Sequence, residues 1–164
     1  MILVTLGTSK FAFNRLAKTI NLYANKSSHP IIIQTGQTQS FNQSSQVILK
    51  DFYSFKNLIN LTKKAKLVIT HAGEISSLLA IKHCQTPPIV IPRDPRYEEH
   101  VDNQQLKIAQ VLNQKKLAIV LKNPIHLEKT ITNYPKLINS LKTYSPSKTL
   151  KHLIQSLDTY TKSL

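Results

Sequence analysis

Short apolar runs alternate with helix-patterned segments along most of this 164-residue chain. Each run is three to five residues long and consists mainly of Ile, Val and Leu, which is typical of strands buried on both faces. The runs lie at residues 2–6, 31–33, 47–49, 67–70, 89–91 and 117–121. Because helical segments of about ten residues separate them, the sequence predicts an α/β fold with a doubly wound, mainly parallel Rossmann-like sheet of about six strands.

The segments between the runs carry apolar side chains at helical spacing. Such patterns cover residues 13–24, 55–62, 75–83 and 106–112. Asp102 and Gln105 have the spacing of a capping box at the start of the last of these helices. A further helical pattern at about 146–164 predicts a C-terminal tail, so the whole chain is expected to form a single domain with that tail at its end.

Only three glycines occur, and each follows the C-terminal end of a predicted strand: Gly7, Gly36 and Gly73. Ligands bind at this edge of an open α/β sheet, and glycine allows a positive φ or a close approach of ligand to backbone. The turn at Gly73 also leads into a predicted helix, whose N-terminal N–H groups suit a phosphate. The alternative is that the glycines merely ease tight turns. Neither GxGxxG nor a GxxxxGKS or GxxxxGKT motif is present, which disfavours dinucleotide-binding and P-loop functions.

The balance of charges is strongly basic. Twenty-two Lys and Arg stand against 8 Asp and Glu, giving a formal net charge of +14 and a pI near 10.0. Such a chain favours an acidic partner, meaning nucleic acid, an anionic membrane surface or a phosphorylated ligand. The lysines are scattered, aromatic residues make up 7% and Trp is absent, which counts against a stacking platform. A basic nucleic-acid-binding domain is therefore an alternative that only the charge favours, and no nucleic acid is expected as a partner.

The remaining composition points to an intracellular protein without a metal. The single cysteine, Cys84, excludes an intramolecular disulfide and is expected to be a small buried residue. No signal peptide or membrane-spanning run is evident, which predicts a cytoplasmic protein. His71, His83 and His100 lack metal-ligand spacing, and no G-x-S-x-G nucleophile motif occurs.

Six motifs occur together in one order: ILVTLGT at 2–8, FNRL at 13–16, IIQTG at 32–36, THAG at 70–73, IPR at 91–93 and EHVDNQQ at 99–105. With these motifs the chain resembles the family 28 glycosyltransferase C-terminal-domain proteins over roughly residues 1–121. The likeness is greatest to the short stand-alone members, the PssE-like subunits of polysaccharide synthesis and the Alg13-like subunits of N-glycan assembly.

The resemblance implies the C-terminal, donor-binding half of a GT-B glycosyltransferase. It implies a UDP-sugar as donor substrate, no further cofactor, no metal ion and an inverting transfer of a hexose or N-acetylhexosamine. The acceptor half is then expected on a membrane-anchored, PssD- or Alg14-like partner, which would hold this chain at the cytoplasmic membrane face. The implied acceptor is a sugar on a polyprenyl diphosphate, in exopolysaccharide, capsule or lipid-linked oligosaccharide synthesis. The alternative is a non-catalytic enhancer subunit that binds and stabilises a transferase.

The resemblance also implies a donor-binding set. The diphosphate is expected over the turns formed by Gly7, Thr8, Ser9, His71, Ala72 and Gly73. Arg93 would neutralise a phosphate or hold the nucleotide loop. The remaining donor contacts are expected from Ser76, His100, Asn103, Gln104 and Gln105.

Two catalytic candidates follow from this set, and a base on the partner is the alternative. Glu99 is the carboxylate considered as a base, although it could instead simply pair with Arg93 or Arg96. His71 would orient the phosphate or assist proton transfer, or else pack within the turn. The chain also departs from the family pattern at three positions, which bear on nucleotide affinity and sugar identity: Ile75 replaces a Gly, Leu79 a Glu and Gln104 a His.

Overall fold

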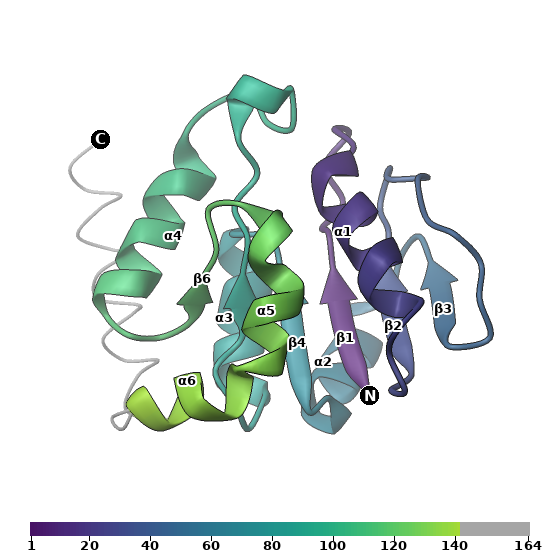
Figure 1. Cartoon of the computed structure of the whole chain (residues 1–164). Coiled ribbons are helices and arrows are strands. Elements are labelled where there is room, and N and C mark those ends of the chain that lie inside the picture. Colours follow the sequence, from purple (N-terminus) through teal and green to yellow (C-terminus); the bar gives the residue numbers. More distant parts are fainter. Residues whose placement is uncertain (142–164) are drawn as a thin grey trace.

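The computed structural model describes residues 1–141 and contains one six-stranded sheet with helices on both faces (Figure 1). All strand pairs are parallel, in the order β3-β2-β1-β4-β5-β6. The strands are β1 (Ile2–Thr5), β2 (Ile31–Gln34), β3 (Val47–Lys50), β4 (Leu67–Thr70), β5 (Ile89–Val90) and β6 (Ile119–Val120). The predicted parallel, doubly wound α/β fold is therefore confirmed.

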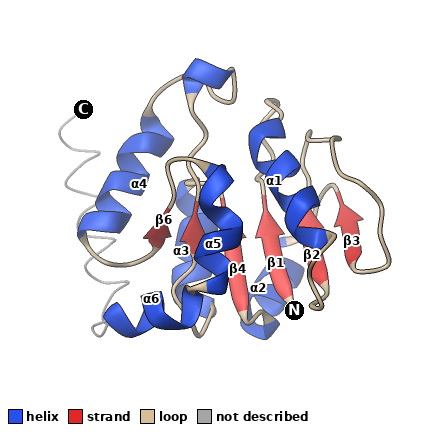
Figure 2. Ribbon diagram, in the orientation of Figure 1, coloured by secondary structure: helices blue, strands red, loops and turns tan. Residues whose placement is uncertain are grey.

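Six α-helices and two 3₁₀ turns connect and follow these strands within residues 1–141 (Figure 2). The helices are α1 (Asn14–Ala24), α2 (Phe55–Lys64), α3 (Glu74–His83), α4 (Gln104–Gln114), α5 (Leu127–Thr132) and α6 (Tyr134–Ser140). The 3₁₀ turns are η1 (Pro95–Tyr97) and η2 (Pro124–His126). In both turns a proline opens the turn and the preceding Asp94 or Asn123 side chain accepts an N–H two residues on.

Alternate residues of each central strand face opposite layers, and both layers are buried. Ile2 and Val4 of β1 join the core beneath α1, α5 and α6, whereas Leu3 packs toward the layer that α2 and α3 cover. Val90 of β5 packs with α3 and α4. Because the central strands β1 and β4 are buried on both sides, their sequences show a continuous apolar run rather than an alternation.

The observed elements differ from those predicted from the sequence mainly in the C-terminal half of the described residues. β5 and β6 are each only two residues long, and α6 was not anticipated. Tyr134 anchors α6, because its buried hydroxyl donates a hydrogen bond to the carbonyl of Pro87, and this contact between distant segments leaves no local pattern. The predicted helical tail at 146–164 lies outside the described residues.

The strand order reverses direction between β1 and β4, the central pair of the sheet. Thr5 and Thr70 end these two strands opposite each other, and the Thr5 hydroxyl donates a 2.7 Å hydrogen bond to that of Thr70. At such a switch point the chain leaves the two strands toward opposite faces, which opens a crevice beyond their carboxyl ends. The fold thus places the turns after β1 and β4 side by side.

Candidate donor-binding site

A cavity of about 450 Å³ lies at this carboxyl edge of the sheet. The turns after β1 and β4 form its centre, the segment between β3 and α2 lines one side, and the segment leading into α4 lines the other. The lining residues that the sequence predicted are Gly7, Thr8, His71, Ala72, Gly73, Ser76, His100, Gln104 and Gln105. Gly7 therefore meets, in one site, predicted residues from His71 to Gln105 that lie 64 to 98 positions further along the sequence.

The imidazole of His71 packs between the two glycine turns. A Cβ on Gly7 would lie 2.6 Å from its Cε1 and Nε2 atoms, and a Cβ on Gly73 would come still closer to Nε2. Gly7 also has φ +75°, whereas Gly73 has an ordinary backbone conformation. Glycine at position 73 is thus required by the ring and not by backbone strain, and glycine at position 7 is required by both.

The environment of His71 keeps its ring uncharged at neutral pH. The side chain is buried, and its Nδ1 lies 3.4 Å from the Thr5 carbonyl oxygen. Burial, together with the nearby positive charge of Arg93, lowers the pKa of His71 to about 4. A neutral ring whose Nδ1–H points at that carbonyl presents the Nε2 lone pair toward the glycine turns.

Helix α3 begins at the floor of the cavity without a capping side chain. Gly73 is the N-cap residue and makes no side-chain hydrogen bond, so the first N–H groups of α3 remain open toward the cavity. The positive end of the helix dipole and these N–H groups make the position suitable for an anion. Glu74 in the first turn is exposed and, within residues 1–141, is the one carboxylate that lines the cavity.

Three aromatic residues that sequence reasoning missed form one side of the cavity. Phe52, Tyr53 and Phe55 follow β3 and lead into α2, and the Phe52 and Phe55 side chains are 58% and 60% exposed. Ser54 caps α2 by accepting the N–H of Asn57, which fixes the turn that presents them. The one available signal was three aromatic residues within four positions directly after a predicted strand.

The opposite side of the cavity is formed by the start of α4. The side chains of His100, Gln104 and Gln105 line it, but Gln105 does not complete the predicted capping box. Its Oε1 accepts the backbone N–H of Arg93 at 3.1 Å, while Asp102 alone accepts an N–H of the helix start, that of Gln104. The box fails because Gln105 is buried against the loop after β5.

Arg93 lies beneath the cavity surface. It is 1% exposed and donates hydrogen bonds to the carbonyls of Leu6 (2.8 Å), Phe11 (2.8 Å) and Glu99 (3.2 Å). Its guanidinium also stacks on the ring of Phe13, 4.9 Å from the ring centroid. Of the two roles predicted for Arg93, these contacts describe the one in which it holds the loop, because no part of the side chain reaches the surface.

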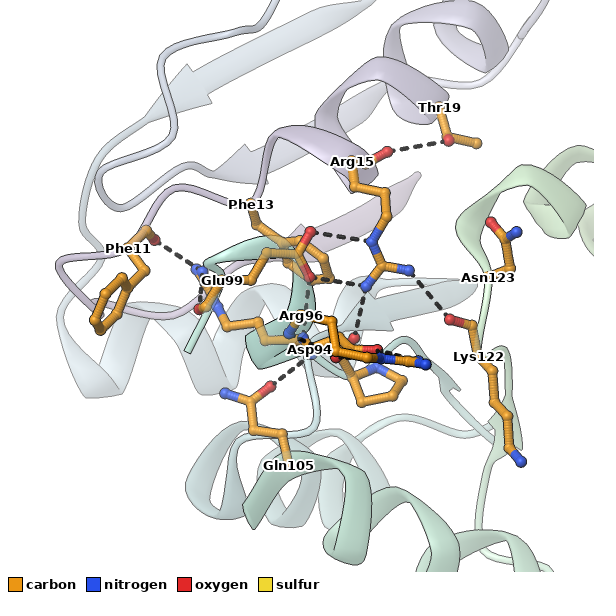
Figure 3. A network of polar contacts seen from close by, with 12 residues as sticks. Phe11, Phe13, Arg15, Thr19, Asp94, Arg96, Glu99, Gln105, Lys122 and Asn123 are labelled. Carbon is orange, nitrogen blue, oxygen red and sulfur yellow. Dashed lines mark hydrogen bonds and ion pairs between the residues drawn. The ribbon is translucent and has the colours of Figure 1, made fainter. Parts of the chain in front are cut away.

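Glu99 pairs with Arg15 of α1, not with Arg93 or Arg96 as the sequence predicted (Figure 3). Its two oxygens accept hydrogen bonds from Nε and Nη2 of Arg15 at 3.0 and 2.8 Å, and one of them also accepts the N–H of Asp94. The carboxylate is 3% exposed and lies outside the cavity. The carboxylate that the sequence offers as a base is thus held in an ion pair with Arg15.

Arg96 is engaged by a different carboxylate. Its guanidinium holds the side chain of Asp94 through three hydrogen bonds of 2.6 to 3.1 Å and lowers the pKa of that carboxyl. The two ion pairs leave Asp94 and Glu99 both satisfied, so the segment between β5 and α4 is fixed on two sides.

A family model, the glycosyltransferase family 28 C-terminal domain, matches residues 1–157 of the chain. The chain belongs to this family. Its fold is equivalent to the C-terminal, Rossmann-like half of GT-B glycosyltransferases. No curated protein sequence matches it.

Solved glycosyltransferase structures share the fold of this family 28 domain. The glycotransferase of kitacinnamycin superposes with a TM-score of 0.63 at 13% identity, covering 100% of this chain and 43% of its own. MurG of Acinetobacter baumannii gives 0.59 at 14% identity, covering 95% and 49%. SnogD of Streptomyces nogalater gives 0.58 at 16% identity, covering 94% and 42%. The domain thus spans less than half the length of each of these proteins.

Two further residues of the predicted donor-binding set lie outside the lining of the cavity. The Ser9 hydroxyl accepts the N–H of Phe11 within the loop after β1, and Asn103 is the N-cap residue of α4 and exposed. In the described part of this family 28 domain, no three His, Cys, Asp or Glu side chains gather as a metal site. No helix among residues 1–141 is both long and apolar enough to span a bilayer.

Proposed function

We propose that this chain is the donor-binding subunit of a two-component glycosyltransferase that uses a UDP-sugar. Its fold corresponds to one half of the GT-B enzymes that it resembles, and its cavity opens at the edge of the sheet where the other half of such an enzyme would stand. The observation that carries the proposal is the open N-terminus of α3 beside the turn after β1, at the switch point of the sheet.

The diphosphate of the donor fits over the two glycine turns. Backbone N–H groups at Thr8 and at the start of α3 can donate to phosphate oxygens there, with the Ser76 side chain beside them. The same donors would stabilise the negative charge that develops on the leaving UDP. In this proposal they take the role that a metal ion plays elsewhere, and the transfer is inverting and independent of metal.

The aromatic side of the cavity suits the base of the nucleotide. Phe52, Tyr53 and Phe55 offer apolar and aromatic surface for a flat ring, which binds by stacking and burial. The amides of Gln104 and Gln105 on the opposite side can hydrogen-bond sugar hydroxyls. A nucleotide-sugar would thus lie across the cavity with its diphosphate at the centre.

The acceptor side of the reaction is assigned to a membrane-anchored partner. Glu99 is buried in an ion pair, and His71 is packed beneath the glycine turns, so neither is placed to deprotonate an acceptor hydroxyl. The partner would supply that base and bind a sugar on a polyprenyl diphosphate. A formal charge of +14 would hold this chain at an anionic membrane surface and near the lipid diphosphate.

Isothermal titration of the chain with UDP, UMP and ADP tests the donor site. We expect UDP to bind more tightly than UMP, and we expect Phe55→Ala to weaken UDP binding at least about threefold because aromatic contact is lost. Leu22→Ala is the matched control, because Leu22 is 65% exposed but lies on α1, away from the cavity. Equal binding of UDP by both variants would contradict the placement of the base.

Transfer requires the second protein. Co-expression with a candidate membrane subunit should give transfer from a UDP-sugar to a polyprenyl-diphosphate acceptor. Ser76→Asp should abolish that transfer, because it adds a carboxylate beside the diphosphate position without displacing the His71 ring. A non-catalytic enhancer would instead raise the transfer by a partner already active alone, and Ser76→Asp would leave that increase intact.

A further inference from the structure

We propose that Arg93 is a positioning residue that sets the spacing between the loop after β1, at the centre of the cavity, and the segment entering α4. In this role it also keeps a permanent positive charge behind the cavity. Arg93 would act on an anionic ligand without touching it. The identity of that anion as a nucleotide diphosphate rests on the proposed function, whereas the mechanical and electrostatic roles can be measured in the chain alone.

Arg93 connects the loop at the centre of the cavity to the segment that lines its α4 side. Leu6 precedes the Gly7 turn and Phe11 lies in the same loop, and both accept hydrogen bonds from the guanidinium. The third carbonyl is that of Glu99, which immediately precedes His100 on the α4 side. One planar group thus joins the loop after β1 to the segment entering α4.

Only arginine has the geometry for this connection. Its five N–H groups point in fixed directions in one plane, whereas a lysine ammonium is a compact group on a flexible stem. Two guanidinium nitrogens reach three carbonyls at 2.8 to 3.2 Å, and the backbone N–H of the same residue is held by Gln105. The guanidinium group therefore fixes the loop after β1 and the segment entering α4 relative to each other and to the sheet.

The positive charge of Arg93 is not neutralised by direct contact with a carboxylate. Within residues 1–141 its partners are neutral carbonyls and the face of Phe13, and its buried Nε–H has no acceptor there. The two neighbouring carboxylates are held by other arginines, Glu99 by Arg15 and Asp94 by Arg96. Three guanidinium groups and two carboxylates leave this network with one net positive charge.

The charge acts on the cavity through His71. Arg93 is one of the causes that lower the pKa of His71, after burial, and His100 contributes in the same direction. Burial lowers the pKa of Arg93 itself only to about 10, so it stays protonated at neutral pH beside an uncharged imidazole. A buried cation is weakly screened by salt, and its attraction for an anion over the glycine turns is correspondingly persistent.

Three variants separate the charge from the hydrogen-bonding fork. Arg93→Met removes both and approximately preserves volume, and Arg93→Lys keeps the charge but cannot bond three carbonyls together. Lys18→Met is the matched control, because it removes a positive charge from an exposed side chain of α1 that lies outside the network of Arg93, Arg15 and Arg96. All three are measured in the chain without ligand by ¹H–¹⁵N NMR of the His71 ring and by amide hydrogen exchange.

In Arg93→Met the His71 ring should titrate at a higher pH than in the parent chain, because a nearby cation has been lost. In Lys18→Met it should titrate as in the parent. Amide exchange over residues 7–11 should accelerate in Arg93→Met and Arg93→Lys alike. A folded Arg93→Met with parental His71 titration would overturn the electrostatic role. Should Arg93→Met fail to fold, unchanged exchange over 7–11 in Arg93→Lys would overturn the mechanical role.

Titration with UDP and with inorganic pyrophosphate connects both roles to binding. We expect Arg93→Met to weaken both ligands about tenfold or more, and Lys18→Met to change neither by more than about twofold. Parental affinity in Arg93→Met would refute the effect on anions. If the parent chain binds neither ligand, the proposed function fails, whereas the His71 titration and the exchange data still decide the role of Arg93.

Discussion

The imidazole of His71 occupies the space that a side chain at Gly73 would need. A Cβ added there would lie 2.9 Å from both Cδ2 and Cε1 of the ring, and nearer still to Nε2. The ring and the glycine are therefore a matched pair: the glycine lets a buried histidine sit directly beneath the start of α3, and the histidine forbids any larger residue.

This pairing predicts a rescue that depends on position. Gly73→Ala should destabilise the chain by about 1–3 kcal/mol, because the ring must be displaced. Adding His71→Ala should recover most of the loss attributable to the clash, because the backbone at Gly73 is ordinary. Gly7→Ala should not be rescued in the same way, since φ +75° strains any side chain. Urea unfolding of the single and double variants measures these differences.

The depressed pKa of His71 predicts acid sensitivity. An unfolded histidine titrates near 6.5, whereas in the folded chain burial and the charges of Arg93 and His100 lower the His71 pKa to about 4. Between these values the unfolded state binds more protons, so stability is complete above about pH 6.5 and is lost as the pH falls toward 4.

The loss of folding free energy caused by the shifted pKa of His71 is at most about 3 kcal/mol. Urea unfolding of the parent and of His71→Asn at pH 7 and pH 5, at constant ionic strength, isolates it from the other titrating groups. The parent should lose more stability than the variant between the two pH values. An equal loss in both would show that His71 is not held neutral.

Two adjacent glutamates should respond very differently to the same substitution. Glu99→Gln removes the charge that holds Arg15 and should destabilise the chain by about 2 kcal/mol or more, because the pair is buried on the Glu99 side. Glu98 is exposed, so Glu98→Gln should change stability by less than about 0.5 kcal/mol. Thermal or urea unfolding compares the two, and similar losses would contradict the assigned pairing.

Cys84 should be protected from thiol reagents until the chain opens. It is 1% exposed, and its Sγ lies 3.7 Å from the carbonyl of Ala65 and 3.6 Å from the Thr86 hydroxyl. Labelling by a chromogenic disulfide in native buffer should be slow and should accelerate with urea in step with unfolding. Complete labelling within minutes in buffer alone would mean that the layer beneath α3 opens readily. Cys84→Ala provides the blank.

The placement of the site was accessible from the sequence because it depends on local signals. A strand that ends in Gly7 or Gly73 and leads toward a helix marks the ligand edge of a parallel sheet without knowledge of any distant contact. The start of α4 was placed nearly correctly for the same reason, although Gln105 turned out to bond Arg93. Strand boundaries at β5 and β6 were less accurate, because only two residue pairs join β5 to each of its neighbours and no local pattern shows where that pairing stops.

The sequence did not predict which aromatic residues line the cavity or which arginine pairs with Glu99. No periodic pattern in the sequence shows whether Phe52, Tyr53 and Phe55 line a cavity or belong to the core. Only their position at the carboxyl edge of the folded sheet shows that they line the cavity. Glu99 had two arginines nearby in the sequence, yet it pairs with Arg15, which is 84 residues away.

The amino-acid sequence by itself predicted the parallel sheet, its two buried faces and the edge at which a ligand would bind. These features follow from hydrophobic periodicity and glycine placement, which can be read within a few residues of sequence. Tertiary structure alone decided which charged side chains pair and that the buried Arg93 donates to three backbone carbonyls. It also decided that the His71 ring occupies the space that side chains at Gly7 and Gly73 would need. Such choices depend on which distant segments the packing brings within a few ångströms, and no short stretch of sequence encodes that distance.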